Sequence, residues 1–217
     1  MKYEAVFFDY DGTVADSIAD IAYAANRALR EKGLPERDAA EYRAFAGKGA
    51  RTLLRRAAPA CTDEAALEAM YASYVAWYAG HANDRTKPFQ GVPELLSALQ
   101  EAGLKLAVIS NKPDAAVQPG AARFFAPWLS LTLGERSGIA VKPAPDMLAF
   151  AARELGVELS RCLYVGDTEV DLETARNTGI DCAAVTWGFR SREQLIQAGA
   201  ALLFDSPDEL RAYILDS

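Results

Sequence analysis

Two aspartates follow directly after the first apolar run of the chain, and this arrangement restricts what the chain can fold into. The run, Ala5 to Phe8, has the branched and aromatic residues that are typical of a short buried strand. Asp9 and Asp11 therefore lie at the carboxyl end of that strand, where open α/β sheets place their chemistry. Because side chains alternate along an extended backbone, both carboxylates point to one side and Tyr10 to the other. Two like charges in one small space favour a site that also binds a divalent cation.

The two residues after this pair also fit a ligand site. Gly12 lets a ligand approach the backbone, and Thr13 offers a hydroxyl. The competing interpretation is an N-terminal strand that ends in an acidic turn.

Composition and charge exclude several classes of partner. The 217 residues, of which 51% are hydrophobic and 24% are charged, suit one globular unit or a core domain with a modest insertion. The formal net charge of −7 argues against a nucleic acid or an anionic membrane as partner, because both demand a basic surface. An anionic small molecule stays compatible with this charge if a few local cations bind it.

The sequence predicts neither a membrane segment nor a leader. The first strand follows residues 1–4 at once, and no apolar run approaches the length of a membrane span. We therefore expect a cytoplasmic protein. Cys61, Cys162 and Cys182 lack the paired spacing of zinc or redox sites, so we expect reduced cysteines in the core.

The stretch between Thr13 and Pro88 has helical periodicity and no strand-like alternation. We expect its first helix to be capped by Asp16 or Ser17 and to end at Gly33. Further helices are expected at residues 37–45, around Leu53 and Leu54, and from Thr62 to His81.

Four helices without a strand predict a small bundle inserted into the fold. We therefore expect an inserted helical domain over residues 15–87 and a core domain over residues 1–14 and 88–217. Tyr71, Tyr74 and Trp77 have helical spacing, and we expect them to pack in the core of the inserted domain.

From Pro88 onward, helices and strands alternate, which is the signature of parallel βαβ units. Pro119-Gly120 should bend or interrupt one of the helices. The fold class is therefore α/β with a mainly parallel sheet. Strands are expected at residues 104–109, 129–133, 162–165, 182–185 and 202–204, and helices at 93–102, 115–125, 146–155, 172–177 and from 207.

Polar side chains stand at the ends of three predicted strands. After the carboxylate pair, Ser110-Asn111-Lys112 and Gly166-Asp167 follow two later strands, Lys142 precedes a helix, and Asp171 opens another. The carboxyl ends of parallel strands lie at one edge of a sheet, so these groups should meet. Together they suit phosphoryl transfer, in which an aspartate nucleophile needs a metal, a lysine and hydrogen-bond donors against the negative charge of the phosphate.

Four segments in this order resemble the motifs of the haloacid dehalogenase (HAD) superfamily. They are Asp9-Tyr10-Asp11-Gly12-Thr13, Ser110-Asn111-Lys112-Pro113, Lys142-Pro143-Ala144-Pro145 and Gly166-Asp167-Thr168-Glu169-Val170-Asp171. The resemblance covers the whole chain and is to the phosphatase branch with a helical cap of the C1 type, most of all to the phosphoglycolate phosphatases. It implies a Rossmann-like core, the HAD fold, with residues 15–87 as the cap.

The resemblance implies a role for each motif. Asp9 would attack phosphorus and carry an aspartyl phosphate, while Asp11 would protonate the leaving alkoxide and then activate water. Ser110 would bind phosphoryl oxygens, and Lys142 would pair with Asp9 and the phosphate. The core residues implied to bind substrate are Gly12, Thr13, Asn111 through its backbone, and Lys112.

The implied cofactor is Mg²⁺. The Asp9 carboxylate, the Asp11 backbone carbonyl and Asp167 would hold it. Asp171 would either orient the metal's ligands through water or support Lys142, and the sequence leaves both roles open. Helix capping is the alternative role for Asp167 and Asp171.

The loop Gly47-Lys48-Gly49, with Arg51 after it, is the candidate for recognition of the rest of the substrate. In related phosphatases a glycine-containing loop closes over the leaving group here, so we expect Lys48 or Arg51 to meet a second anionic group. A plain turn with solvated cations is the alternative. Two departures from the family pattern are Tyr10, an unusual residue between the two aspartates, and Gly134-Glu135, where glycine-aspartate is usual.

The function expected from these features is Mg²⁺-dependent hydrolysis of a small phosphomonoester through an aspartyl phosphate. The best candidate substrate is 2-phosphoglycolate. Alternatives on the same scaffold are a pyrophosphatase, a nucleotidase, or a sugar-phosphate phosphatase or phosphomutase. A binding protein without turnover is disfavoured because the motifs are complete, and a monomer or a homodimer is expected.

Overall fold

The computed structural model describes residues 2–216 and has a parallel sheet at its centre. Within these residues the sheet has six strands in the order β5-β4-β1-β6-β7-β8, all paired in parallel. Strand β1 lies between β4 and β6, so the residues after it reach the middle of the carboxyl edge. The predicted α/β class is confirmed. The strands are β1 (Ala5–Phe8), β4 (Lys105–Pro113), β5 (Leu131–Glu135), β6 (Cys162–Gly166), β7 (Asp181–Val185) and β8 (Leu202–Phe204).

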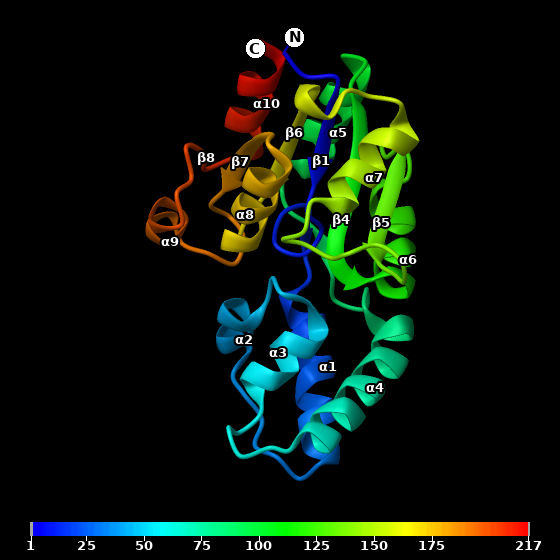
Figure 1. Ribbon diagram of the computed structural model, residues 1–217, viewed down its shortest axis with the longest axis vertical. Helices are drawn as coiled ribbons and strands as arrows, with labels where there is room; N and C mark the ends of the chain where they lie inside the picture. The colour runs from blue at the N-terminus through cyan, green and yellow to red at the C-terminus, as the bar shows by residue number, and fades with distance from the viewer. Residues whose placement is uncertain (1, 217) are drawn as a thin grey trace.

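Helices cover both faces of this sheet (Figure 1). Alternation along β1 sends Val6 and Phe8 to one face and Ala5 and Phe7 to the other, and all four are buried. Burial on both faces explains why this strand reads as a continuous apolar run. The first face packs against α5 (Val92–Glu101), α6 (Asp114–Phe125) and α10 (Pro207–Asp216), and the second against α7 (Asp146–Leu155) and α8 (Glu169–Thr178).

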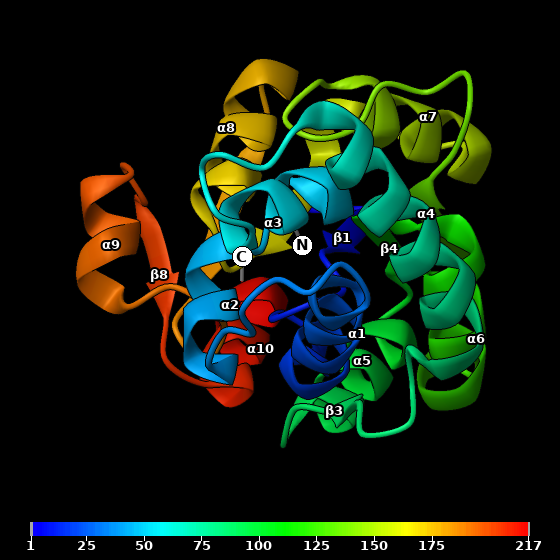
Figure 2. The same ribbon diagram turned by 90° about the horizontal axis from the view of Figure 1, so that it is seen from below.

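A separate layer of helices stands at the carboxyl edge of the sheet (Figures 1 and 2). It has an apolar core of its own, and we call it the helical layer. A short antiparallel pair, β2 (Ala15–Asp16) and β3 (Lys87–Pro88), carries the chain out of the core and back. The layer consists of α1 (Ile18–Glu31), α2 (Ala39–Phe45), α3 (Gly49–Ala57) and α4 (Glu64–His81).

Several elements differ from what the sequence predicts. Helix α6 runs through Pro119 without interruption. Ser17 is the N-cap residue of α1, but its side chain makes no capping bond and its hydroxyl donates to Asp11 instead. Strand β4 continues past Ile109, so the Ser110-Asn111-Lys112 segment lies within the strand rather than after it.

Four short elements are not predicted from the sequence. These are β2, β3, helix α9 (Arg192–Gln197) and a 3₁₀ turn at Leu159–Arg161. The two strands have two residues each, and α9 has six, which is less than two helical turns, so none of the three shows a clear apolar period. Within the described residues, no helix has both the length and the apolar character needed to cross a membrane.

Two unusual sequence features, Tyr10 and Gly120, meet in the structure. The Tyr10 side chain leaves β1 on the side away from Asp9, and its hydroxyl donates to Asn83 in the segment between α4 and β3. A Cβ atom built on Gly120 would lie closer than 3.0 Å to the Tyr10 hydroxyl oxygen. The glycine in α6 therefore makes room for the tyrosine, and the two departures from a regular pattern are one packing arrangement.

Replacing Gly120 by alanine is expected to lower the free energy of unfolding by about 1–3 kcal/mol, because the new methyl group overlaps with the Tyr10 hydroxyl. In a Tyr10→Phe background the same replacement should cost less, since one of the two overlapping oxygens is gone and only Asn83 Oδ1 stays. Gly80→Ala in α4, where a Cβ atom meets nothing within 4 Å, is the matched control and should not destabilise the protein. Urea unfolding measures these differences, and an equal cost in both backgrounds would contradict the packing argument.

Candidate active site

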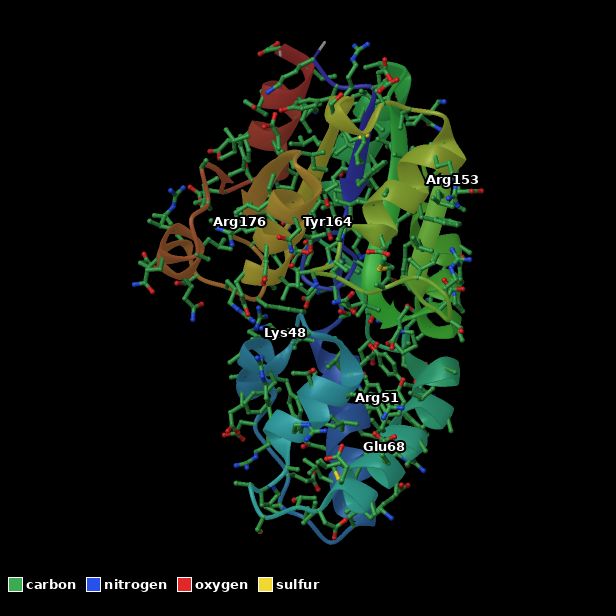
Figure 3. All side chains as sticks on the ribbon, viewed as in Figure 1. Lys48, Arg51, Glu68, Arg153, Tyr164 and Arg176 are labelled. Carbon is green, nitrogen blue, oxygen red and sulfur yellow. The ribbon has the colours of Figure 1, made fainter. Side chains whose placement is uncertain are left out.

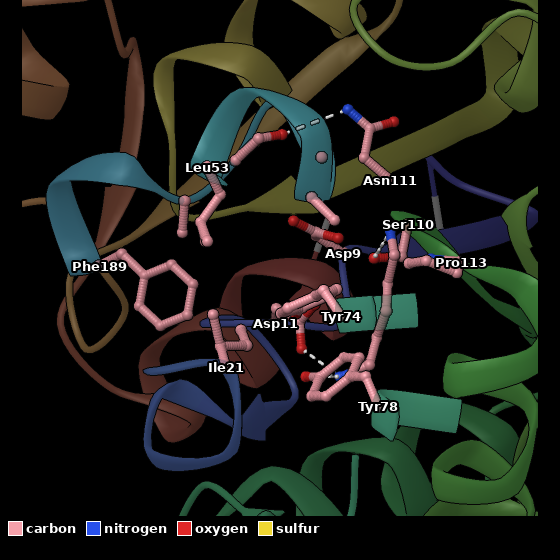
Figure 4. A pocket seen from close by; sticks show the side chains of 15 residues that line it. Asp9, Asp11, Ile21, Leu53, Tyr74, Tyr78, Ser110, Asn111, Pro113 and Phe189 are labelled. Carbon is pink, nitrogen blue, oxygen red and sulfur yellow. Dashed lines mark hydrogen bonds and ion pairs between the residues drawn. The ribbon is translucent and has the colours of Figure 1, made fainter. Parts of the chain in front are cut away.

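A small cavity lies between the carboxyl edge of the sheet and the helical layer. Figure 4 shows Asp9 and Ser110 on one side of it and Phe189, Leu53 and Ile21 on the other. The cavity is therefore polar on the side of Asp9 and Ser110 and apolar on the opposite side. Its volume of about 50 Å³ leaves room for a few water molecules.

A buried lysine links two of the predicted aspartates. Lys142 Nζ lies 3.0 Å from Asp9 Oδ1 and 2.8 Å from Asp171 Oδ1, and none of these side chains is more than 8% exposed. The Tyr164 hydroxyl accepts a hydrogen bond from Lys142 at 2.7 Å and donates one to Asp171 Oδ1 at 2.9 Å. Different elements deliver these groups, because Asp9 follows β1, Tyr164 lies in β6 and Asp171 is in the first turn of α8. We call Asp9, Lys142 and Asp171 the ion cluster.

Burial and charge set the protonation of these groups. Burial raises the pKa of the Asp9 carboxyl to about 7 against the attraction of Lys142, and the negative charges of Asp171 and Asp11 add to the increase. Burial also raises the pKa of the Asp167 carboxyl well above its usual value, and the charges of Asp171 and Asp9 raise it further. Asp9 and Asp167 therefore need an additional positive charge nearby in order to be ionised together at neutral pH.

The other two charged groups stabilise each other. Burial opposes the charged form of the Lys142 ammonium, but the charges of Asp171 and Asp9 outweigh it and raise its pKa above the usual value. Burial likewise disfavours the Asp171 carboxylate, but the charge of Lys142 and its hydrogen bonds hold the pKa below the usual value. Lys142 and Asp171 thus form a buried ion pair.

Three buried carboxylates lie close enough together to share a metal ion. Oxygens of Asp9, Asp167 and Asp171 are within 4.8 Å of one another. A dry set of oxygen donors with excess negative charge suits a hard divalent cation such as Mg²⁺. Gly12 allows the close approach, because its φ is +88° and a Cβ atom there would lie closer than 3.0 Å to the Asp167 carboxylate.

The contacts of Asp171 favour support of Lys142 over direct contact with a metal. Its Oδ1 accepts from Lys142 and Tyr164, and its Oδ2 accepts from the backbone and the hydroxyl of Thr168 at 3.0 and 2.8 Å. The bond from the Thr168 backbone belongs to the capping box that begins α8. Helix capping and support of the lysine are therefore combined in one side chain.

Asp11 stands beside the ion cluster and borders the cavity. Its Oδ1 accepts a hydrogen bond from Ser17 at 2.5 Å and lies 2.9 Å from Lys112 Nζ. The side chain of Asp11 is 18% exposed, so it is more open to the cavity than the side chain of Asp9. This placement suits a group that exchanges a proton with a ligand.

The polar residues at the end of β4 connect the core with the helical layer. The Asn111 amide donates to the backbone carbonyls of Lys142 at 2.9 Å and Gly47 at 3.2 Å, and its oxygen accepts from the Lys142 backbone. The Asn111 side chain is thus occupied by the protein. Ser110 is buried at the polar side of the cavity, where its oxygen accepts from the Lys112 backbone at 3.3 Å.

Gly12 and Thr13 lie against Asp167 and are not among the residues that line the cavity. The Thr13 hydroxyl donates to Asp167 Oδ1 at 2.9 Å, and the Phe189 backbone donates to Asp167 Oδ2 at 2.7 Å. The Thr13 hydroxyl, which was expected to bind substrate, therefore positions the Asp167 carboxylate instead.

The cations predicted in the loop of the helical layer do not line the cavity, although Gly47 and Gly49 do. Lys48 is exposed. The Arg51 guanidinium pairs with Glu68, and Figure 3 shows the two side chains next to each other. It also lies 3.8 Å from the centre of the Tyr71 ring. The charge and the flat face of Arg51 thus already have partners on the surface of the layer, which favours the alternative of a turn with solvated cations.

Four aromatic residues take part in the site beyond what the sequence analysis assigns. Tyr164 sits in the middle of a predicted strand and has no motif around it. Tyr74 and Tyr78 line the cavity from α4, and both also belong to the apolar core of the helical layer, as expected for Tyr74. Their spacing of four residues was the available signal, since it puts both on one helix face. Phe189 lies in a loop after β7 and has no periodic signal.

The segment around Phe189 also holds the helical layer to the core. Arg190 is buried and donates to the backbone carbonyls of Arg43 at 2.5 Å and Ala46 at 2.9 Å, at the end of α2. Arg43 donates back to the Gly188 carbonyl at 3.0 Å. The Phe189 backbone also donates to Asp167. Residues 188–190 therefore contact both a carboxylate of the candidate metal site and the helical layer.

Comparisons with known proteins give one consistent family. A model described as haloacid dehalogenase-like hydrolase matches residues 6–185. The N-acetylmuramic acid 6-phosphate phosphatase of Pseudomonas aeruginosa is 32% identical over 97% of this chain and 94% of its own length. The phosphoglycolate phosphatase of Xanthomonas campestris pv. campestris is 34% identical over 95% of this chain and 94% of its own length.

The comparison with solved structures indicates the same family. The crystal structure of a phosphoglycolate phosphatase-like protein from Lactobacillus delbrueckii subsp. bulgaricus superposes with a TM-score of 0.94 at 35% identity, and the match covers 99% of both chains. At this identity and coverage the similarity extends to the whole chain, including the helical layer.

Replacing Arg190 by methionine is expected to loosen the helical layer, because two backbone carbonyls at the end of α2 lose a charged donor. Amide hydrogen exchange of residues 42–50 should become about tenfold faster, the scale of one such bond. Arg192→Met is the matched control, since Arg192 pairs with Asp205 on the surface and should leave these amides unchanged. Exchange followed by mass spectrometry provides the readout, and unchanged rates in the Arg190 variant would refute the contact's role.

Proposed function

Because the chain belongs to the haloacid dehalogenase-like hydrolase family and is one of its phosphatases, we propose that it hydrolyses a small phosphomonoester, with Mg²⁺ as cofactor and Asp9 as nucleophile. The observation that carries this proposal is the ion cluster beside the cavity. It supplies a carboxylate at the cavity wall and, 3.0 Å away, a buried cation that attracts the phosphoryl group.

In the first step, a carboxylate oxygen of Asp9 forms a bond to phosphorus while the bond between phosphorus and the ester oxygen breaks. The Asp11 carboxyl gives its proton to the departing alkoxide. The Ser110 hydroxyl and the Asn111 backbone donate to the phosphoryl oxygens, and Lys142 offsets their negative charge. The alcohol leaves, and the phosphoryl group stays on Asp9 as an acyl phosphate.

In the second step, water attacks the same phosphorus and releases inorganic phosphate. The Asp11 carboxylate takes a proton from the water, and the bond between phosphorus and Asp9 breaks, so both aspartates return to their starting state. Asp171 and Tyr164 hold Lys142 in place during both steps.

The residues present fit Mg²⁺, which the Asp9 and Asp167 carboxylates and the Asp11 backbone carbonyl would hold. When bound, this ion would supply the positive charge that lets Asp9 and Asp167 ionise together and that offsets the charge of the phosphate.

We assign residues 15–87 to a cap domain that covers the site. The contacts from Asn111 to Gly47 and from Arg190 to Ala46 would hold the cap closed over the substrate. A cavity of about 50 Å³ has little room for a substrate to enter from solvent, so the cap would open for substrate to enter and product to leave.

Two kinds of curated relative support the choice of candidate substrates. One acts as a phosphoglycolate phosphatase and another as an N-acetylmuramic acid 6-phosphate phosphatase. We propose 2-phosphoglycolate as the first candidate, because the small cavity favours a small leaving group, and a sugar phosphate as the second.

Purified protein with Mg²⁺ is expected to release phosphate from 2-phosphoglycolate with a higher kcat/KM than from N-acetylmuramic acid 6-phosphate. Asp9→Asn keeps the shape of the side chain but removes the nucleophilic anion, so turnover should fall by about a thousandfold or more while the unfolding temperature is retained. Phosphate release and calorimetric unfolding measure the two effects. Substantial residual turnover by the Asn variant, with deamidation excluded by mass spectrometry, would rule out Asp9 as nucleophile.

Proton transfer and metal binding should separate between two further variants. Asp11→Asn keeps the backbone carbonyl and should slow phosphate release by about two to four powers of ten with little change in Mg²⁺ affinity. Asp167→Ala removes a carboxylate from the metal site and should weaken Mg²⁺ binding at least about tenfold. Titration calorimetry with Mg²⁺ compares the two, and equal affinity in wild type and Asp167→Ala would disprove the assignment of Asp167.

A further inference from the structure

Lys112 alone has a cationic side chain among the described residues that line the cavity. It comes from β4, and its side chain is only 1% exposed. The ammonium lies 2.9 Å from Asp11 Oδ1 and donates to the Tyr78 hydroxyl at 2.8 Å. It also lies 4.9 Å from the centre of the Tyr10 ring and 4.8 Å from that of Tyr78. A buried cation is thus held in one place by a carboxylate, a hydroxyl and two aromatic faces.

The position of this ammonium relative to Asp11 matters for substrate choice. An ester oxygen that receives a proton from Asp11 must come within hydrogen-bond distance of that carboxyl. The Lys112 ammonium is also within hydrogen-bond distance of the Asp11 carboxyl. A substituent on the carbon that carries the ester oxygen therefore comes next to this ammonium. An ammonium has three donors, and Asp11 and Tyr78 take two of them.

The opposite wall of the cavity offers little to a charged leaving group. Ile21, Leu53 and Phe189 are apolar, and Lys48 and Arg51 are not among the lining residues. Among the described lining residues, Lys112 is therefore the one cation that a carboxylate on the leaving group could meet, and a buried carboxylate without a cation is strongly disfavoured.

We propose that Lys112 is the residue that selects the substrate, by binding a carboxylate attached one or two atoms from the ester oxygen. This inference rests on the proposed function and makes it more specific. The substrates are then phosphate esters of small hydroxy acids, and the recognising cation comes from the core strand β4 rather than from the loop of the helical layer. Tyr78, from α4, holds the ammonium at the cavity while the layer covers the site.

The test compares two esters that differ in one charge. These are 2-phosphoglycolate and 2-phosphoglycolamide, in which an uncharged carboxamide replaces the carboxylate. The wild type should prefer the carboxylate, and the ratio of the two kcat/KM values should fall by about 10- to 100-fold in Lys112→Met, the scale of one hydrogen bond to a charged group. Turnover of both esters should also fall, because Asp11 loses a partner.

Other variants separate recognition from positioning and from folding. Tyr78→Phe keeps the charge but removes the hydroxyl that holds the ammonium, so the ratio should fall by a smaller factor of about three. This variant carries the test if Lys112→Met does not fold. The Lys48→Met/Arg51→Met double variant should keep the wild-type ratio.

Three results would overturn the inference. An unchanged ratio in Lys112→Met, with equal losses on both esters, would show that Lys112 only positions Asp11. A fall of the ratio in the Lys48/Arg51 double variant alone would assign the carboxylate to the loop of the helical layer. A wild type that hydrolyses both esters equally well, or that hydrolyses only N-acetylmuramic acid 6-phosphate, would also refute it and leave the phosphatase proposal standing. No turnover of any of the three esters would remove both proposals.

Discussion

The ammonium of Lys142, buried between the carboxylates of Asp9 and Asp171, is the charge on which the arrangement of the site depends. A charge in the protein interior is tolerated only with close partners and satisfied hydrogen bonds, so each neighbour has a defined place. Tyr164 completes the shell of Lys142 from β6, and Asn111 binds its backbone from β4. Strands from both sides of β1 therefore converge on one lysine that itself lies in a loop.

The second determining feature is that the cavity is shared between two layers. The core supplies the carboxylates, Ser110 and Phe189, and the helical layer supplies Ile21, Leu53 and the tyrosines of α4. Contacts between the layers run through residues next to the chemistry, such as Asn111 with Gly47 and Lys112 with Tyr78. When the helical layer covers the site, it therefore also holds the polar side chains of Asn111 and Lys112 in place. Exclusion of water then strengthens the interactions of the buried charges.

The elements that the sequence predicts correctly are those with a strong local signal. The run at residues 5–8 and the helix at 146–155 occur where expected, because apolar periodicity, glycine and proline act over a few residues. The placement of Arg51 and Thr13 was not predictable in this way. Arg51 is drawn to Glu68 and Tyr71 on a neighbouring helix, and Thr13 to Asp167, which is 154 residues away in the chain. Such partners are chosen by three-dimensional packing, which leaves no local pattern.

The sequence by itself determined the α/β class, the edge of the sheet at which the aspartates lie, and the types of residue available for chemistry there. These follow from alternation, from strand polarity and from the order of the motifs along the chain. The motif resemblance already pairs Lys142 with Asp9, but only the tertiary structure decided that Lys112 lies against Asp11 and that Lys48 and Arg51 lie away from the site. The sequence offers four candidate cations of the same kind, Lys142, Lys112, Lys48 and Arg51. The first two are buried against aspartates, whereas the last two lie on the surface. The physical reason is that the energy of a charge depends on its distances and its burial, and both arise only when distant segments pack together.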